Sequence, residues 1–417
     1  MKTALSLLLA TTLGCVAYEP RPVDWQAEAE SLATDPVSVT LSDSDLCLRA
    51  IAFCPELNAL RLEHAAAKAK AEAAGWWEDP SLNADFLRIL HEPANPLVLG
   101  GSLTFTLPLT GIPALEKKAA ALYAEAGYWT VVQAERNTGA ETIRLAVTAR
   151  ELQSLVREIE SSLSDTNYVD AVETASRLAE VGEIPRTDVL QLTGSARELR
   201  QTLNELRHEQ AEAEARLRRM ALLPPNSRFV WATDEKPPEP PAVTFTPLDF
   251  LRQPSVRAAL AKLEGGENEV RKEIRRQYPE LSLGPAAGRE DGQNRFGLSA
   301  SLSLPLWNRN RAGIATATGE RDQLRQSALD TWRDAVYNWY ELVREQRNFH
   351  TANPFLEENC GRPDEAARLY VLGEYGAADY AGLVHQTLSE EIAHTRQKID
   401  YAAMSARMNA IAEGLKE

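Results

Sequence analysis

The pattern of apolar and polar residues repeats twice along the chain. Residues 103–109 read LTFTLPL, and residues 302–306 read LSLPL at the end of an alternating run that begins at Phe296. Alternation with a period of two is the pattern of a β-strand with one apolar and one polar face. Each run closes at a proline, Pro108 or Pro305, and a long helical pattern follows each one. The sequence therefore predicts one structural unit built twice.

A second strand candidate precedes each run, SLNADF at 81–86 and ELSLG at 280–284. Four strands of about ten residues match a membrane-spanning length but cannot close a barrel, so other copies of the chain would supply the missing strands. A half-buried strand of a soluble sheet alternates in the same way. In a membrane channel the apolar side chains would face lipid, and in a soluble protein they would be buried. The residues expected on this face are Leu103, Phe105, Leu107, Leu298, Leu302 and Leu304.

The helical patterns predict long antiparallel hairpins. Past Pro113 the pattern stays helical to Val181, about 70 residues and roughly 100 Å. Within this pattern apolar residues recur with alternating spacings of four and three, which is typical of a coiled-coil seam. Gly182 marks a tight turn before the return helix. The seam is Leu145, Ala149, Leu152, Val156, Ile159 and Leu163, and the return seam is Val189, Leu192, Ala196, Leu199, Leu203, Leu206, Ala213, Leu217 and Met220.

Shorter helices are expected on either side of Pro55, one from residue 41 with Ser42 or Ser44 as its N-cap, and one over 56–74. Trp76 and Trp77 follow, and they suit either an interfacial aromatic belt or a buried core. In the second half a helix is expected over 258–276. A long helix from Gly313 should break at Asn353-Pro354 and near Gly361.

Internal duplication explains this arrangement. ASRLAEVGEIPRTD at 175–188 matches AARLYVLGEYGAAD at 366–379. Gly373 in the second segment corresponds to Gly182 and marks the turn of the second hairpin. Prolines over 223–247 predict a stiff linker between the halves. The expected domains are an export signal at 1–17, an N-terminal arm at 18–40, a first repeat at 41–222, the linker, and a second repeat at 248–417.

The first residues, MKTALSLLLATTLGC, have the pattern of an export signal. Cys15 suits a bacterial lipobox and would then be the lipidated N-terminus, whereas ordinary cleavage near Ala17 is the alternative. Cys47 and Cys54 lie about 10 Å apart along a helix axis, too far for a disulfide if both are helical. Cys360 has no neighbouring cysteine in the sequence.

Composition argues against two classes of function. With 45 Lys and Arg against 60 Asp and Glu, the net charge of −15 lacks the basic excess of a general nucleic-acid binder. The motif HEQAE at 208–212 lacks the second histidine of a zinc peptidase, and the sequence has no P-loop, GxSxG or CxxC motif. We therefore expect no enzyme, no cofactor and no metal centre.

The order of these elements resembles the TolC-like family of outer-membrane efflux channels over nearly the whole mature chain. The stretches that carry the resemblance are NALRLEHAAAKAKAEAAGWWEDPSL, the junctions PLTGIP and PLWNRNRAGIATA, and the two RLxxxGE turns followed by an aspartate. PLWNRNRAGIA is similar to the heavy-metal, CzcC-like branch. The resemblance implies a mainly α fold with a small β part, in which three chains form a twelve-stranded outer-membrane barrel and a periplasmic α-barrel.

The resemblance also implies roles at the opposite end. Gly182 and Gly373 would lie at the periplasmic tip, where the homotrimer meets an adaptor (membrane fusion protein) linked to an inner-membrane pump. Asp379 matches an acidic position of the tip aperture, and Asp188 occupies the corresponding place in the first half; helix N-capping is the alternative role of both. The position of the family's second aperture acid is occupied by Gly382 here. The aperture would therefore be less acidic, which weakens the hypothesis that it selects cations.

The expected function is a passive exit duct through the outer membrane, carrying substrate, with metal cations as a candidate class, from pump and adaptor to the exterior. The low His and Met content gives no sign of a metal relay. A periplasmic coiled-coil adaptor or scaffold is the alternative, because its hairpins have the same seam. Adaptors usually carry one hairpin, so the duplication favours the channel.

Overall fold

The computed structural model describes residues 18–33, 38–40, 42–88, 97–231, 239–290, 293–352, 363–374 and 376–416. Three expectations concern residues outside this set: the export signal with Cys15, the isolated Cys360, and the helix break at Asn353-Pro354 and Gly361. Cys47 and Cys54 form no disulfide with each other, and Cys54 lies just past the end of its helix.

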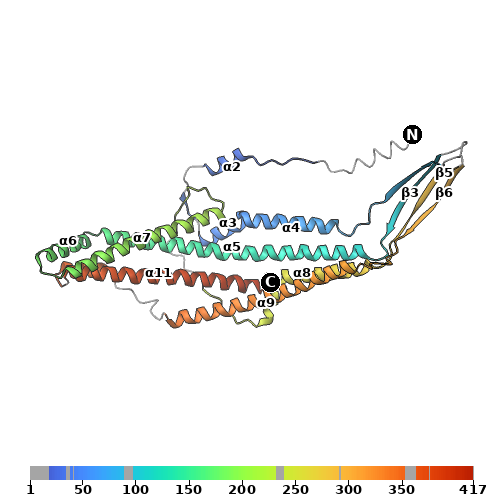
Figure 1. Ribbon diagram of the computed structural model, residues 1–417. Helices are drawn as coiled ribbons and strands as arrows, with labels where there is room; N and C mark the ends of the chain where they lie inside the picture. Colours follow the sequence, from blue (N-terminus) through green and yellow to red (C-terminus); the bar gives the residue numbers. More distant parts are fainter. Residues whose placement is uncertain are drawn as a thin grey trace.

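The chain is elongated, with a β-sheet at one end and helices running away from it (Figure 1). The first half contains α2 (Trp25–Leu32), β1 (Ser38–Val39), α3 (Asp43–Phe53), α4 (Pro55–Ala73), β2 (Ser81–Arg88), β3 (Leu97–Leu107), α5 (Ile112–Ser164), α6 (Thr166–Val181), α7 (Arg186–Met220) and β4 (Arg228–Phe229). The second contains the 3₁₀ helix η1 (Pro247–Arg252), α8 (Pro254–Arg275), β5 (Leu281–Glu290), β6 (Gln293–Leu302), α9 (Arg311–Ala352), α10 (Pro363–Val371) and α11 (Ala377–Gly414).

Local signals set most helix ends. Ser42 accepts a hydrogen bond from the backbone N–H of Asp45 and caps α3, as expected. The expected single helix from Pro113 to Val181 is wrong, because the chain leaves helical geometry at Asp165 (φ −59°, ψ 133°). The Asp165 carboxylate accepts from the backbone N–H groups of Asn167 and Tyr168 and starts α6 as a new helix.

The predicted coiled-coil seam is buried. Leu152 and Ile159 of α5 are completely buried, as is Leu206 of the return helix α7. Residues of α11 join the same core, including Ala381, Val384 and Leu388. The two halves therefore share this hydrophobic core, and each half also has a core cluster of its own.

The sheet also joins the halves. Its four strands are antiparallel in the order β2-β3-β5-β6, so the first hairpin pairs with the second through β3 and β5. β3 ends at Leu107, directly before Pro108, as predicted. β6 ends at Leu302, before Pro305 is reached, and the expectation that strand pairing continues to Leu304 is wrong.

The linker between the halves is anchored to the N-terminal arm. Ser38 and Val39 of the N-terminal arm pair in parallel with Arg228 and Phe229 of the linker. The Phe229 ring is buried and stacks on Trp231 with 5.0 Å between ring centroids. Within the described ranges, no helix is long and apolar enough to cross a membrane.

Candidate functional site

The strand register separates the sheet into two chemically different faces. Cross-strand partners in an antiparallel sheet point to the same side, so the pairs Leu82↔Leu103, Phe105↔Leu283 and Leu283↔Ala300 define one face. This face, which we call the apolar face, carries Leu82, Ala84, Phe86, Leu99, Leu103, Phe105, Leu107, Leu281, Leu283, Pro285, Ala287, Phe296, Leu298, Ala300 and Leu302, with Arg88, Arg289 and Asn294 at one end.

The opposite face is mostly polar or small. It carries Ser81, Asn83, Asp85, Ser102, Thr104, Thr106, Ser282, Gly284, Ala286, Arg295, Ser299 and Ser301, and the pair Leu87 and Val98 is its apolar part. The hydroxyls of Thr106 and Ser282 lie 3.2 Å apart across the strands on this face. Alternation in the sequence thus becomes a sheet with one side suited to lipid and the other to water.

Five of the six residues expected on the lipid side share the apolar face, namely Leu103, Phe105, Leu107, Leu298 and Leu302. Leu304 lies beyond the end of β6 and has no strand partner. Large side chains of this face are exposed in the single chain: Leu298 is 86% and Phe296 85% accessible. A soluble protein would bury such a surface, because contiguous apolar patches are costly in water.

Aromatic residues gather where the sheet joins the helices. Trp76 and Trp77 precede β2, Tyr278 precedes β5 and Trp307 follows β6. All four are exposed in this chain, so the alternative of a buried core for Trp76 and Trp77 is wrong within a single chain. Tryptophan and tyrosine prefer membrane–water interfaces, and their position marks one border of the apolar face.

The helical end opposite the sheet is formed by two turns. Gly182 (φ +83°) lies between α6 and α7, and Gly373 (φ +76°) lies between α10 and α11. Both glycines adopt the left-handed conformation that other residues rarely adopt, so glycine suits these tight turns. Val181, Leu190, Val371 and Leu372 are exposed beside them.

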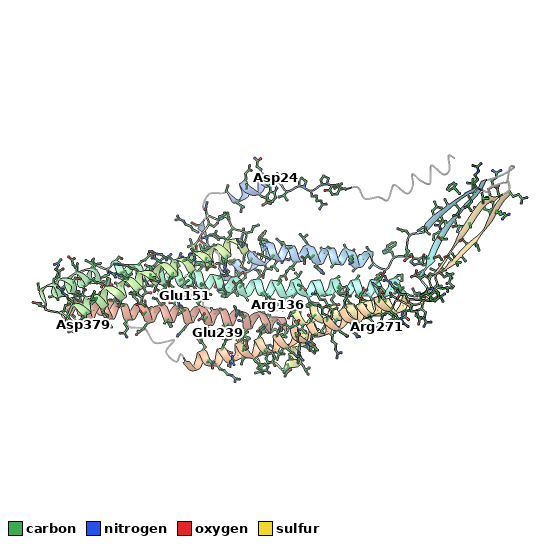
Figure 2. The ribbon with its side chains drawn as sticks, viewed as in Figure 1. Asp24, Arg136, Glu151, Glu239, Arg271 and Asp379 are labelled. Carbon is green, nitrogen blue, oxygen red and sulfur yellow. The ribbon has the colours of Figure 1, made fainter. Side chains whose placement is uncertain are left out.

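A groove of about 780 Å³ separates α7 from α11 near these turns. Both predicted aperture acids, Asp188 and Asp379, line it, and Figure 2 shows Asp379 at the end of the molecule opposite the sheet. Glu198 adds a third carboxylate, and no lysine or arginine is among the described residues of the lining. The N-cap positions of α7 and α11 are Pro185 and Gly376, so neither aspartate is the N-cap residue.

No family model and no curated protein matches this sequence. Solved structures do match over nearly the full length. The chain is similar to CusC, whose structures concern transmembrane channel formation, at 13% identity, covering 95% of each chain with a TM-score of 0.70. It is similar to the outer-membrane channel OprN at 17% identity, covering 96% of this chain and 98% of that one with a TM-score of 0.68. The Campylobacter jejuni channel CmeC matches at 15% identity, 97% and 90% coverage and a TM-score of 0.66.

The chain has the TolC-like outer-membrane channel fold. The fold expected from the sequence, mainly helical with a small β part, is therefore confirmed. These three solved structures are of channels or concern channel formation.

A buried histidine near the groove was missed by sequence reasoning. His385 of α11 is 6% exposed, and its Nε2 lies 2.6 Å from the hydroxyl of Tyr168 on α6. Burial lowers the pKa of His385 and raises that of Tyr168, so both are neutral at pH 7. The only signal in the sequence is a polar residue between Val384 and Leu388, which are both buried.

A carboxyl pair between α5 and α11 was also missed. The pKa of Glu391 is raised to about 7, first by burial, then by the negative charge of Glu158 and by a hydrogen bond with it. The two glutamates are far apart in sequence, so no local pattern predicts their contact. Among the described residues, no three His, Cys, Asp or Glu side chains are grouped so that they could hold a metal ion.

Proposed function

We propose that this protein is the outer-membrane exit duct of a tripartite efflux system and conducts its substrate passively. The exposed apolar face of the sheet is the observation that carries the proposal. A membrane-spanning sheet must satisfy its backbone hydrogen bonds within protein, and therefore must close into a barrel.

The sheet has two open edges, β2 and β6, in the described part of the chain. Pairing β6 of one copy with β2 of the next would remove both edges, and three copies of a four-stranded sheet make a closed, even-numbered barrel of twelve strands. The apolar face would then contact lipid, and the hydroxyl-rich face would line the water-filled interior. The exposed Trp76, Trp77, Tyr278 and Trp307 would meet the periplasmic headgroups.

The helices would continue the duct across the periplasm. We propose that the turns at Gly182 and Gly373 contact a periplasmic adaptor, which links the channel to an inner-membrane pump. The exposed apolar residues Val181, Leu190 and Val371 support this, because a protein contact would cover them. Export of the mature chain follows from this location, and Cys15 would be either its lipid anchor or part of the removed signal.

Substrate choice would be made mainly by the pump. The groove lined by Asp188, Asp379 and Glu198 supports passage of cations through the tip aperture. Metal cations are the substrate class that the resemblance of PLWNRNRAGIA to the heavy-metal branch favours.

The mass of the detergent-purified protein tests this function. The mature chain should be extracted from the outer-membrane fraction, and its mass, corrected for bound detergent, should be three times that of the chain. Reconstitution in planar bilayers should give ionic conductance. A soluble monomer or dimer would instead mean that the hairpins belong to a periplasmic scaffold.

A further inference from the structure

The apolar face is not apolar along its whole length. At the end farthest from the helices it carries Arg88 of β2, Arg289 of β5 and Asn294 of β6. These are its only charged or amide-bearing residues within the paired strands. The opposite face carries one acidic and one basic side chain, Asp85 on β2 and Arg295 on β6, so among the described side chains the excess of positive charge belongs to the apolar face alone.

The register places the two arginines close together. Arg88 pairs with Leu97 on one side of β3, and Arg289 pairs with Leu99 on the other. They are therefore two strand spacings apart, with an offset of two residues, which gives roughly 12 Å between their Cα atoms. Both side chains are exposed, and neither forms an ion pair with a described residue. One ligand lying over β3 can contact both guanidinium groups.

The height of Arg289 matches a membrane border. The strand from Leu281, beside the exposed aromatic residues, to Arg289 has nine residues and therefore eight residue-to-residue steps. That is roughly 27 Å along the strand and about 20 Å along the axis of a barrel with tilted strands. An outer-membrane barrel has an apolar band about 25 Å tall. Arg289 and Arg88 therefore lie near the far edge of this band, where lipid headgroups begin.

We propose that Arg88 and Arg289 form a binding site for the phosphate groups of a phosphorylated lipid in the outer leaflet. Arginine matches phosphate because its planar guanidinium donates two parallel hydrogen bonds to it. Asn294 adds an amide donor at the same level, and Phe296 and Leu298 lie below it to contact acyl chains. The site rests on the proposed function, since its ligand is available only if the apolar face lies in a membrane.

A binding measurement with matched variants tests the site. Detergent-purified full-length protein, first shown to have threefold chain mass, is titrated with diphosphoryl lipid A in mixed micelles. R88Q/R289Q should weaken binding by at least about tenfold, because two charge-assisted contacts are lost. R295Q removes an arginine from the other face and should change binding by less than about twofold. R88K/R289K keeps the charge without the guanidinium fork and should fall between.

Equal binding by the wild type and R88Q/R289Q would overturn the inference, as would an equal loss in R295Q. Inorganic phosphate in large excess should not displace the lipid, because inorganic phosphate has no acyl chains to contact Phe296 and Leu298. Displacement would mean that the arginines bind any phosphate anion, and it would overturn the lipid site. Should R88Q/R289Q fail to assemble, the wild-type trimer is compared with dephosphorylated lipid A, which must bind more weakly. Failure of the mass measurement itself would reject the proposed function, whereas a trimer without phosphate preference rejects this site alone.

Discussion

The helical region and the sheet treat the same kind of side chain in opposite ways. Leu206 of α7 is completely buried among helices of its own chain, whereas Leu298 of β6 is 86% exposed. Both positions follow from a regular apolar pattern, with a period near 3.5 in the helix and of two in the strand. The comparison teaches that helices from the two halves cover one another's apolar residues, whereas the four-stranded sheet leaves its apolar face exposed, and the proposed barrel would place that face against lipid.

The largest expected effect tests the self-contained part. Leu206→Ala should lower the free energy of unfolding of the helical region by about 2–5 kcal/mol, because it leaves a cavity in the shared core. The measurement is the thermal midpoint by circular dichroism of the purified protein. Leu190→Ala is the control, since Leu190 is 71% exposed, and its midpoint should stay close to that of the wild type. Similar shifts for both variants would contradict the packing of the seam.

A charge on the apolar face tests the dependent part. Leu298→Arg should cost about 2–4 kcal/mol in membrane assembly, since Leu298 lies near the middle of its strand. Leu302→Arg should cost less, about 0–1 kcal/mol, because Leu302 ends β6 at the border of the band. The yield of trimer in the outer-membrane fraction measures both.

Ser299→Arg is the matched control for Leu298→Arg, because Ser299 points to the other face of the same strand. Its trimer yield should resemble that of the wild type. If Leu298→Arg assembled as well as Ser299→Arg, the apolar face would not contact lipid.

A methyl group at Gly284 tests how the two halves meet. A Cβ there would overlap the carbonyl oxygen of Leu103 on the neighbouring strand, whereas a Cβ on Gly297 would meet nothing within 4 Å. Gly284→Ala should therefore destabilise the sheet by about 3 kcal/mol and reduce the trimer yield, and Gly297→Ala should not. Equal yields would mean that β3 and β5 are not as close as the structure has them.

The smallest expected effect concerns pH and the helices. The pKa of Glu391 is raised from its usual 4.5 to about 7. Between pH 4.5 and pH 7 the folded chain therefore keeps the proton on Glu391, whereas the unfolded chain has released it. Stability should fall as pH rises through this range. Glu391→Gln should abolish this fall and stabilise the protein at pH 8 by about 2 kcal/mol, because it removes the partly buried charge that Glu158 repels. Solvent screens part of this repulsion, so the full pKa shift is not converted into stability.

Thermal midpoints at pH 5 and pH 8 measure this effect. Glu390→Gln is the control, since Glu390 is the exposed neighbour of Glu391 and accepts a hydrogen bond from Gln386 at 2.9 Å. The control should keep the pH dependence of the wild type. An unchanged dependence in Glu391→Gln would show that another group is responsible.

Most of the fold could be predicted because its signals are local. The seam from Leu145 to Ile159, the turns at Gly182 and Gly373, and the four strands were predicted and are present in the structure. The break at Asp165 was not predicted, because no proline or glycine marks it; the available signal was the run Ser164-Asp165-Thr166-Asn167, whose residue types favour caps and turns over helix interiors. For the candidate sites, the sequence predicted which residues alternate but not how far the pairing of β6 extends.

By itself, the sequence determined the period of each element, the positions of its turns and the duplication of the unit, since these depend on neighbours within a few residues. The tertiary structure alone decided that β3 pairs with β5, that α11 enters the core of the first hairpin, and that His385 meets Tyr168. It also decided that Arg88 and Arg289 flank one strand on one face. These contacts join residues far apart in the chain, and a one-residue change of register would move every strand side chain to the opposite face.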